Sequence, residues 1–388
     1  MEYESLLLTL CRAALTEDSL DASALSALDA DGWGELYRLA KHHDLCHIVA
    51  EGVSRLAVSP PDGILSKLER QRMIALYRTE QMTFELASLT AVLGERSIPH
   101  LPLKGSVLRE LYPSPELRLS CDIDLLVSRR DLAAAREALV SIGYTDEGEN
   151  SHDVQLYAPS GLHVELHFDL IESGYLPEAA ALLEDVFRYA SPEPDRPFTY
   201  RLSDEMFYFY HIAHMAKHFS VTGGCGVRPF LDLFILSLAG RCGDADARAE
   251  LLLRGGLSAF EAAATELSQI WMRGEAHTPR SAALSSFVLT GGVYGAVENR
   301  VAVSRGKGKG RLAYLLSRLL PSYRFMIFRY PILRRLPILL PFLYVVRILS
   351  PLWSGRRRQI LREARVSTGV SSETLHGTEA LLSELGLL

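Results

Sequence analysis

Apolar positions in the first quarter of the chain recur at helical spacing. Between residues 64 and 93, Leu68, Met73, Met82 and Leu86 belong to a pattern with no Gly or Pro inside it. This spacing predicts one long helix, which follows a break at residues 60–63, where two prolines precede Asp-Gly. We expect residues 1–97 to form an N-terminal helical region.

The pattern changes near residue 98, where short apolar runs begin to alternate with helical stretches. Ser128 and Asp131 have the spacing of a capping box at a helix start. Residues 159–161 (Pro-Ser-Gly) are typical of a hairpin turn between two strands. Strands are predicted at 101–105, 122–127, 154–159 and 162–170, and helices at 106–112 and 129–141. Residues 98–200 are therefore expected to form a mixed core.

Helical patterns return after residue 202. They cover DEMFYFYHIAHMAKHF, then RPFLDLFILSLAG after the GGCG break, and most of residues 244–295. We expect residues 201–300 to form a helical domain and 301–388 to form a basic, apolar helical segment with a tail. The predicted fold class is α+β, with the mixed core flanked by helical regions.

Two acidic side chains interrupt the predicted strand at 122–127. Side chains alternate along a strand, so Asp122 and Asp124 share one face while Ile123 and Leu125 share the other. Burying unpaired carboxylates side by side is costly, and a divalent cation such as Mg²⁺ removes that conflict. The alternative is a structural acid pair.

The predicted strand at 162–170 repeats this pattern. His163, Glu165 and His167 share one face, opposite an apolar face. If this strand lies beside the aspartate pair, Glu165 supplies a third carboxylate. Three carboxylates can hold two metal ions, which activate an attacking hydroxyl and stabilise the leaving oxygen in phosphoryl transfer. The alternative is a glutamate that faces water.

A possible phosphate-binding turn lies upstream, at Lys104, Gly105 and Ser106. Glycine allows a close backbone approach, and N–H groups at a helix start can hold phosphate oxygens together with the serine hydroxyl. Lys104 either neutralises phosphate or pairs with an acid, and both interpretations stay open.

The order of turn, helix, Asp-x-Asp strand and later acid resembles the nucleotidyltransferase superfamily to which DNA polymerase beta belongs. In detail it is similar to an uncharacterised bacterial nucleotidyltransferase family with the motifs LKG, R-x-x-x-DIDLLV, GY and VELH. These motifs match residues 103–105, 118–127, 143–144 and 164–167. A later H-x-x-K-H and G-x-R-P-x-x-D stretch is matched by His214, Lys217, His218, Gly226, Arg228, Pro229 and Asp232.

The resemblance implies a polymerase beta-like core that transfers a nucleoside monophosphate from an NTP to an acceptor hydroxyl. The acceptor would be a small molecule, a protein or an RNA end. Two ions, Mg²⁺ or Mn²⁺, would be bound by Asp122, Asp124 and Glu165, and Glu165 would deprotonate the acceptor. The implied nucleotide-binding residues are Lys104, Gly105, Ser106 and Arg118, with His214, His218 and Arg228 as further candidates.

Three histidines in the predicted helix near residue 214 share one face. His211, His214 and His218 are spaced i, i+3 and i+7, which suits a packing face, a cleft or a transition-metal site. Arg228 and Asp232 lie four residues apart and are expected to form a salt bridge on a helix. A phosphate contact is the alternative for this pair.

The charge distribution is asymmetric. The chain has 388 residues, 41 Lys and Arg, 47 Asp and Glu, and a net charge of −6. Residues 301–366 carry 15 basic residues and one acid, so this segment is +14 and the rest is −20. Its longest uncharged run, 336–346, is shorter than the roughly 20 residues of a membrane span. A packed helical segment, RNA binding and contact with an anionic membrane surface stay open.

The amino-acid composition argues against several classes of protein. An apolar content of 48% argues against a wholly disordered chain. Five scattered cysteines without a C-x-x-C pair argue against a zinc ribbon or a disulfide framework and suit a reducing cytosol. The acidic start argues against a signal peptide, so we expect a cytoplasmic protein, with peripheral membrane attachment as a variant.

Two alternatives to an active enzyme stay open. One is a catalytically silent nucleotide-binding regulatory protein, and the other is a membrane-surface or partner-binding protein that uses the basic segment. The presence of all three candidate acids favours the enzyme.

Overall fold

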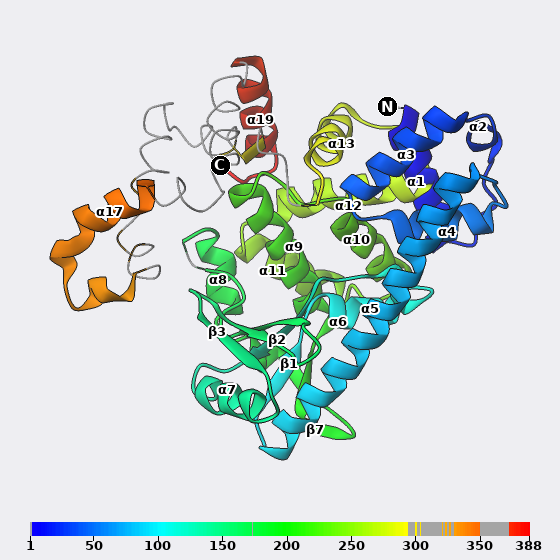
Figure 1. The fold of residues 1–388 in the computed structure, drawn as a ribbon. Helices are drawn as coiled ribbons and strands as arrows, with labels where there is room; N and C mark the ends of the chain where they lie inside the picture. The colour runs from blue at the N-terminus through cyan, green and yellow to red at the C-terminus, as the bar shows by residue number, and fades with distance from the viewer. Residues whose placement is uncertain are drawn as a thin grey trace.

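The computed structural model describes residues 2–172, 174–293, 299, 300, 303, 320, 323, 326, 330–349 and 372–388. Most of the basic segment at 301–366 lies outside these described residues, so its three interpretations stay predictions. Helices surround one mixed sheet, and the predicted α+β fold class is confirmed (Figure 1).

The N-terminal region is helical, as predicted. Its elements are α1 (Glu2–Leu15), α2 (Ser23–Ser26), α3 (Ala30–His42), α4 (Cys46–Arg55) and α5 (Asp62–Glu95). The long helix α5 starts directly after the proline pair. Its first turns bury Ile64 and Leu68 in one apolar core, and its later turns bury Met82 and Leu89 in a second. As Figure 1 shows, α5 runs from the N-terminal helices down to the sheet.

The sheet has seven strands in the order β3-β4-β5-β2-β1-β7-β6. The pairs β2/β5 and β1/β7 are parallel, and the other neighbours are antiparallel. The strands are β1 (His100–Pro102), β2 (Asp122–Val127), β3 (Thr145–Glu149), β4 (Asp153–Tyr157), β5 (His163–His167), β6 (Ala190–Glu193) and β7 (Arg196–Leu202).

All four predicted strands are present, but the sequence pattern missed β3, β6 and β7. The sequence of β3, TDEGE, has no apolar alternation, and β6 carries Pro192 at an irregularity in its pairing. Both β3 and β6 are outer strands, where a strand tolerates polar residues and proline because one side needs no partner. The sheet extends to Leu202, and the division of the chain into four segments stays a prediction.

Short helices connect the first strands. They are α6 (Gly105–Leu108), η1 (Arg109–Leu111), η2 (Pro115–Leu117) and α7 (Leu132–Ser141). The predicted start of α7 at residue 129 is three residues early. The Ser128 hydroxyl accepts the Asp131 N–H at 3.3 Å and donates to the Asp131 carboxylate at 2.6 Å. The two residues therefore close a turn before the helix instead of capping it.

The β4–β5 hairpin forms as predicted, and its position brings β5 beside β2. The turn uses Gly161 at a φ of +83°, a backbone conformation that glycine adopts without a steric penalty. The connection from β2 through α7, β3 and β4 returns the chain so that β5 pairs with β2 in parallel.

The two faces of the sheet bury different cores. Ile123, Leu125 and Val127 of β2 pack against α5 and α7. Leu126 belongs to the larger core, which includes α8 and α9. Because strand residues alternate, Asp122 and Asp124 lie on the same face as Leu126.

The larger core contains residues of the N-terminal helices α1, α3 and α4 together with residues of helices from the second half of the chain. No helix within the described ranges has both the length and the apolar character needed to cross a membrane. The remaining elements are α8 (Pro177–Leu183), η3 (Val186–Tyr189), α9 (Asp204–Val221), α10 (Arg228–Leu238), α11 (Ala245–Arg254), α12 (Ser258–Arg273), α13 (Pro279–Gly291), η4 (Pro331–Arg334), η5 (Pro337–Leu339), α17 (Leu340–Leu349) and α19 (Ser372–Glu384).

Candidate active site

Strands β2 and β5 bring three carboxylates together on one face of the sheet. In this parallel pair Asp124 lies opposite Glu165, and Asp122 lies opposite His163. The expected juxtaposition of the aspartate pair with Glu165 is therefore present. Ligand atoms of Asp122, His163 and Glu165 lie within 4.8 Å of one another, and the same holds for Asp124, Glu165 and His167. Either group has the donors to hold a metal ion.

Asp124 is the most buried of the three acids, at 5% exposure. Its Oδ1 accepts hydrogen bonds from Lys104 Nζ at 2.7 Å and His167 Nε2 at 2.8 Å. Burial alone would raise the pKa of Asp124, but Lys104 and His167 outweigh burial and hold that pKa below its usual range. Asp124 is thus ionised in the folded protein at neutral pH.

The pKa of the neighbouring Asp122 is shifted in the opposite direction, upward. Burial and the negative charge of Asp124 raise the pKa of Asp122 to about 6. Two carboxylates that share one site typically show this divergence, because the second ionisation must work against the first. A bound divalent cation would relieve the repulsion.

Glu165 and His167 complete this cluster. His167 Nε2 lies 3.3 Å from Glu165 Oε2 as well as within bonding distance of Asp124. Burial opposes the charge of Glu165, but the bond to His167 outweighs it and lowers the pKa of Glu165. Burial likewise opposes the charge of His167, but the bonds to the two carboxylates raise the pKa of His167.

Lys104 reaches the cluster from a strained turn after β1. Its φ of 45° and ψ of −116° are uncommon for a residue other than glycine, and such conformations cost on the order of 1–3 kcal/mol. The Leu103 N–H donates to the Asp124 carbonyl at 3.1 Å, which anchors this turn to β2. Of the two interpretations for Lys104, the pairing with an acid is present, and the phosphate contact stays a prediction.

Gly105 and Ser106 have structural contacts of their own. A Cβ at Gly105 would clash with the Ser120 hydroxyl, so glycine lets the turn pack against the loop before β2. The Ser106 N–H donates to the Leu103 carbonyl at 3.1 Å. Ser106 also lines a cavity of about 60 Å³ whose walls include none of the three acids. Phosphate binding by Gly105 and Ser106 stays a prediction.

Arg118 and Asp232 form a buried ion pair between the loop before β2 and helix α10. Arg118 Nε and Nη2 donate to the two Asp232 oxygens at 2.6 and 2.9 Å. The Tyr112 hydroxyl donates to Asp232 at 2.8 Å, and Arg118 also donates to the Leu119 carbonyl at 3.1 Å. Arg118 therefore positions the loop that leads into β2, and its contact with a nucleotide stays a prediction.

The expected salt bridge between Arg228 and Asp232 is wrong. Arg228 Nη2 instead donates to Asp44 Oδ2 at 2.6 Å, in the connection between α3 and α4. Asp232 is fully buried, at 0% exposure, and the planar guanidinium of Arg118 satisfies both of its oxygens. A bidentate partner is the better match for a buried carboxylate.

The three histidines of α9 make different contacts. His211 Nε2 lies 3.0 Å from the Pro229 carbonyl, whereas His214 and His218 contact each other at 3.3 Å between their Nε2 atoms. Burial lowers the pKa of all three rings, to about 4 for His218. None of them belongs to a group of ligand atoms able to hold a metal in the described part of the chain. Nucleotide contacts by His214 and His218 stay predictions.

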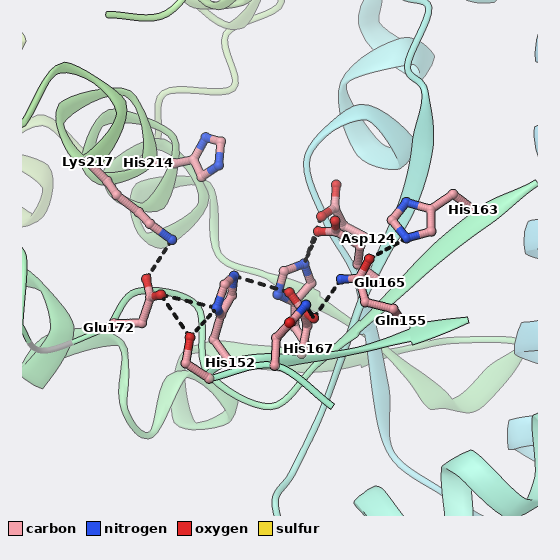
Figure 2. Close-up of polar contacts among 12 residues, drawn as sticks. Asp124, His152, Gln155, His163, Glu165, His167, Glu172, His214 and Lys217 are labelled. Carbon is pink, nitrogen blue, oxygen red and sulfur yellow. Dashed lines mark hydrogen bonds and ion pairs between the residues drawn. The ribbon is translucent and has the colours of Figure 1, made fainter. Parts of the chain in front are cut away.

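A second cluster adjoins the carboxylates and was missed in the sequence. Ligand atoms of His152, Asp153 and His167 lie within 4.8 Å of one another, and Figure 2 shows His152 next to His167. His152 directly precedes β4, and Asp153 is the first residue of β4; their short stretch SHD matches no motif. Their link to His167 depends on the pairing of β4 with β5.

The sequence is also similar to a known protein family. A family model described as "Uncharacterised nucleotidyltransferase" matches residues 29–273, which is more than half of the chain. No curated protein and no solved structure matches the chain.

Proposed function

The chain belongs to the uncharacterised nucleotidyltransferase family, and from this premise we propose a metal-dependent transfer of a nucleoside monophosphate from an NTP to an acceptor hydroxyl. In this reaction the acceptor oxygen bonds to the α-phosphorus. The bond from the α-phosphorus to the oxygen that bridges to the β-phosphate breaks, and pyrophosphate leaves. The acceptor's proton passes to a carboxylate of the site.

The observation that carries this proposal is the pairing of Asp124 with Glu165 across β2 and β5, with Asp122 on the same face. Three carboxylates that converge in a half-buried site are the donor set that Mg²⁺ and Mn²⁺ prefer. Burial and the negative charge of Asp124 raise the pKa of Asp122 to about 6, and a divalent cation at this set would favour the ionised form of Asp122. The residues therefore fit two divalent ions held by Asp122, Asp124 and Glu165.

When bound, such ions would lower the pKa of the acceptor hydroxyl and offset the negative charge of the triphosphate. The protein's own groups supply the rest. Despite its burial, Glu165 is ionised at neutral pH, since the bond to His167 lowers its pKa further below neutral, and its carboxylate is what would accept the acceptor's proton. Lys104 brings a positive charge to the same cluster, where it can shift between Asp124 and a phosphate oxygen.

The proposal is tested with NTPs labelled at the α-phosphate, in the presence of Mg²⁺ or Mn²⁺. Pools of RNA 3′ ends, proteins and small hydroxyl compounds serve as acceptors, and label transfer and pyrophosphate release are measured together. The variants are Asp122→Asn and Glu165→Gln, which keep the side-chain shapes and remove the charges. Asp146→Asn is the matched control, because Asp146 lies on the outer strand β3 and pairs with Arg136.

We expect transfer by the wild type and by Asp146→Asn, and a loss of at least about a hundredfold in the two site variants. Transfer at the wild-type rate by Glu165→Gln and Asp122→Asn would contradict the proposal.

A further inference from the structure

A polar cluster lies next to Asp124, where β4 begins and β5 ends. Asp153 and His167 are register partners in this antiparallel pair, and the Phe168 N–H donates to the His152 carbonyl at 3.0 Å. The backbone therefore fixes His152, Asp153 and His167 next to one another, and Figure 2 shows the two histidines.

We propose that His152, Asp153 and His167 bind a transition-metal ion, with Zn²⁺ as the ion that these donors suit best. Two imidazoles and one carboxylate form a three-ligand zinc site that keeps a position open. Imidazole donors favour Zn²⁺ over Mg²⁺. This ion would be separate from those held by the carboxylates, and the inference does not depend on the proposed transfer activity.

The spacing of the donor atoms suits a zinc ion. His152 Nε2 lies 3.2 Å from Asp153 Oδ2. Tetrahedral zinc with bonds of about 2.0–2.1 Å separates neighbouring ligand atoms by about 3.4 Å. These two atoms therefore already stand close to the separation that a shared ion requires.

His167 provides an independent sign of a ligand. Its Nε2 is engaged by Asp124 at 2.8 Å and by Glu165 at 3.3 Å. Its Nδ1 is fully buried and has no hydrogen-bond partner among the residues that the structure describes, and His167 as a whole is 3% exposed. A buried ring nitrogen without a partner is costly, and a metal ion at Nδ1 would satisfy it.

Both imidazoles are oriented as metal-bound histidines usually are. Such a histidine generally donates its other ring N–H to a carboxylate, which fixes the tautomer and the ring plane. His167 Nε2 faces the Asp124 carboxylate, and His152 Nδ1 lies 3.2 Å from Glu172 Oε1. Glu172 is in turn held by Lys217 at 2.7 Å. Each ring thus presents its second nitrogen for an ion.

The Asp153 carboxylate is also held in place by hydrogen bonds. Asp153 is 2% exposed, and its Oδ1 accepts hydrogen bonds from Asn150 at 2.8 Å and Gln155 at 2.7 Å. The contacts that the structure gives it are two amides and the His152 imidazole. Its Oδ2 therefore points to the histidines, and a cation there would balance a buried negative charge.

Binding is tested on the full chain by competition between the protein and a chromophoric zinc chelator, in excess Mg²⁺ to saturate the carboxylate site. The metal content of the dialysed protein gives the stoichiometry. The variants are His152→Gln and Asp153→Asn, with Asp122→Asn as the control that alters only the neighbouring carboxylate site. Circular dichroism confirms that each variant is folded.

We expect one Zn²⁺ per chain, an affinity at least about tenfold lower in His152→Gln and Asp153→Asn, and near wild-type affinity in Asp122→Asn. Co²⁺ added to the wild type should give the visible absorption of a tetrahedral site. The proposal would be overturned by no stoichiometric Zn²⁺ in the wild type, or by an affinity unchanged in both site variants. It would equally be overturned by a loss as large in Asp122→Asn. All these readouts are independent of nucleotidyl transfer.

Discussion

Asp124 on β2 lies directly opposite Glu165 on the parallel strand β5, and His167 contacts both carboxylates. With Asp122, the cluster contains three carboxylates, and Lys104 forms an ion pair with one of them, Asp124. This imbalance of charge is the physical basis of the proposed metal site, and it leads to predictions that need no knowledge of the acceptor.

The first prediction concerns pH and Asp122. Its pKa is raised from an ordinary value of 3.8 to about 6 in the folded protein, so the unfolded chain releases this proton more readily. The stability linked to protonated Asp122 is present below about pH 4 and is lost as the pH rises through 6. In metal-free buffer, Asp122→Asn should therefore gain up to about 3 kcal/mol in free energy of unfolding over the wild type between pH 4 and 7.

Urea unfolding at several pH values, in the presence of a chelator, measures this difference. A wild type that gains stability over Asp122→Asn across the same pH range would show that Asp122 is not in electrostatic conflict with Asp124.

The second prediction concerns Lys104 as a cation that a metal can replace. Lys104→Met keeps a long side chain on the strained turn but leaves the buried Asp124 without its lysine. Loss of one partner of a buried ion pair costs about 3 kcal/mol. Saturating Mg²⁺ should recover at least half of that loss, because an ion bound to the carboxylates stabilises the folded state.

Thermal and urea unfolding with and without Mg²⁺ test the Lys104→Met prediction. A stability gap between the variant and the wild type that Mg²⁺ leaves unchanged would argue against metal binding at Asp124.

The third prediction concerns the ion pair that replaced the expected one on α10. A double-mutant cycle of Arg118→Gln and Asp232→Asn should give a coupling free energy of about 2 kcal/mol, because the two groups are buried and bonded to each other. The cycle of Arg228→Gln and Asp232→Asn should give less than about 0.5 kcal/mol. Stronger coupling to Arg228 than to Arg118 would contradict the observed pairing.

Local patterns were sufficient to predict the strands that carry the acids. The alternation in DIDLLV and VELH placed Asp122, Asp124 and Glu165 on polar faces, and β2 and β5 have these faces. The long helix α5 was predicted because apolar residues recur at helical spacing across thirty residues that contain no Gly or Pro. In both cases the decisive information lies within a short stretch of chain.

Features that depend on distant partners could not be predicted in this way. The bidentate bond between Arg118 and Asp232 joins residues 114 positions apart, whereas the spacing of Arg228 and Asp232 suggested a local bridge. The strands β3 and β6 have polar sequences, and they form because β3 pairs with β4 and β6 pairs with β7. The contact of His152 and Asp153 with His167 likewise appears only once β4 pairs with β5.

The proposed function requires that Asp122, Asp124 and Glu165 hold divalent ions that bind an NTP. The most direct test is isothermal titration calorimetry of NTPs with and without Mg²⁺, for the wild type, Asp124→Asn and the control Asp146→Asn. We expect Mg²⁺-dependent binding in the wild type and the control, weakened at least about tenfold in Asp124→Asn. NTP binding that needs no metal, or that is unchanged in Asp124→Asn, would contradict the proposed function.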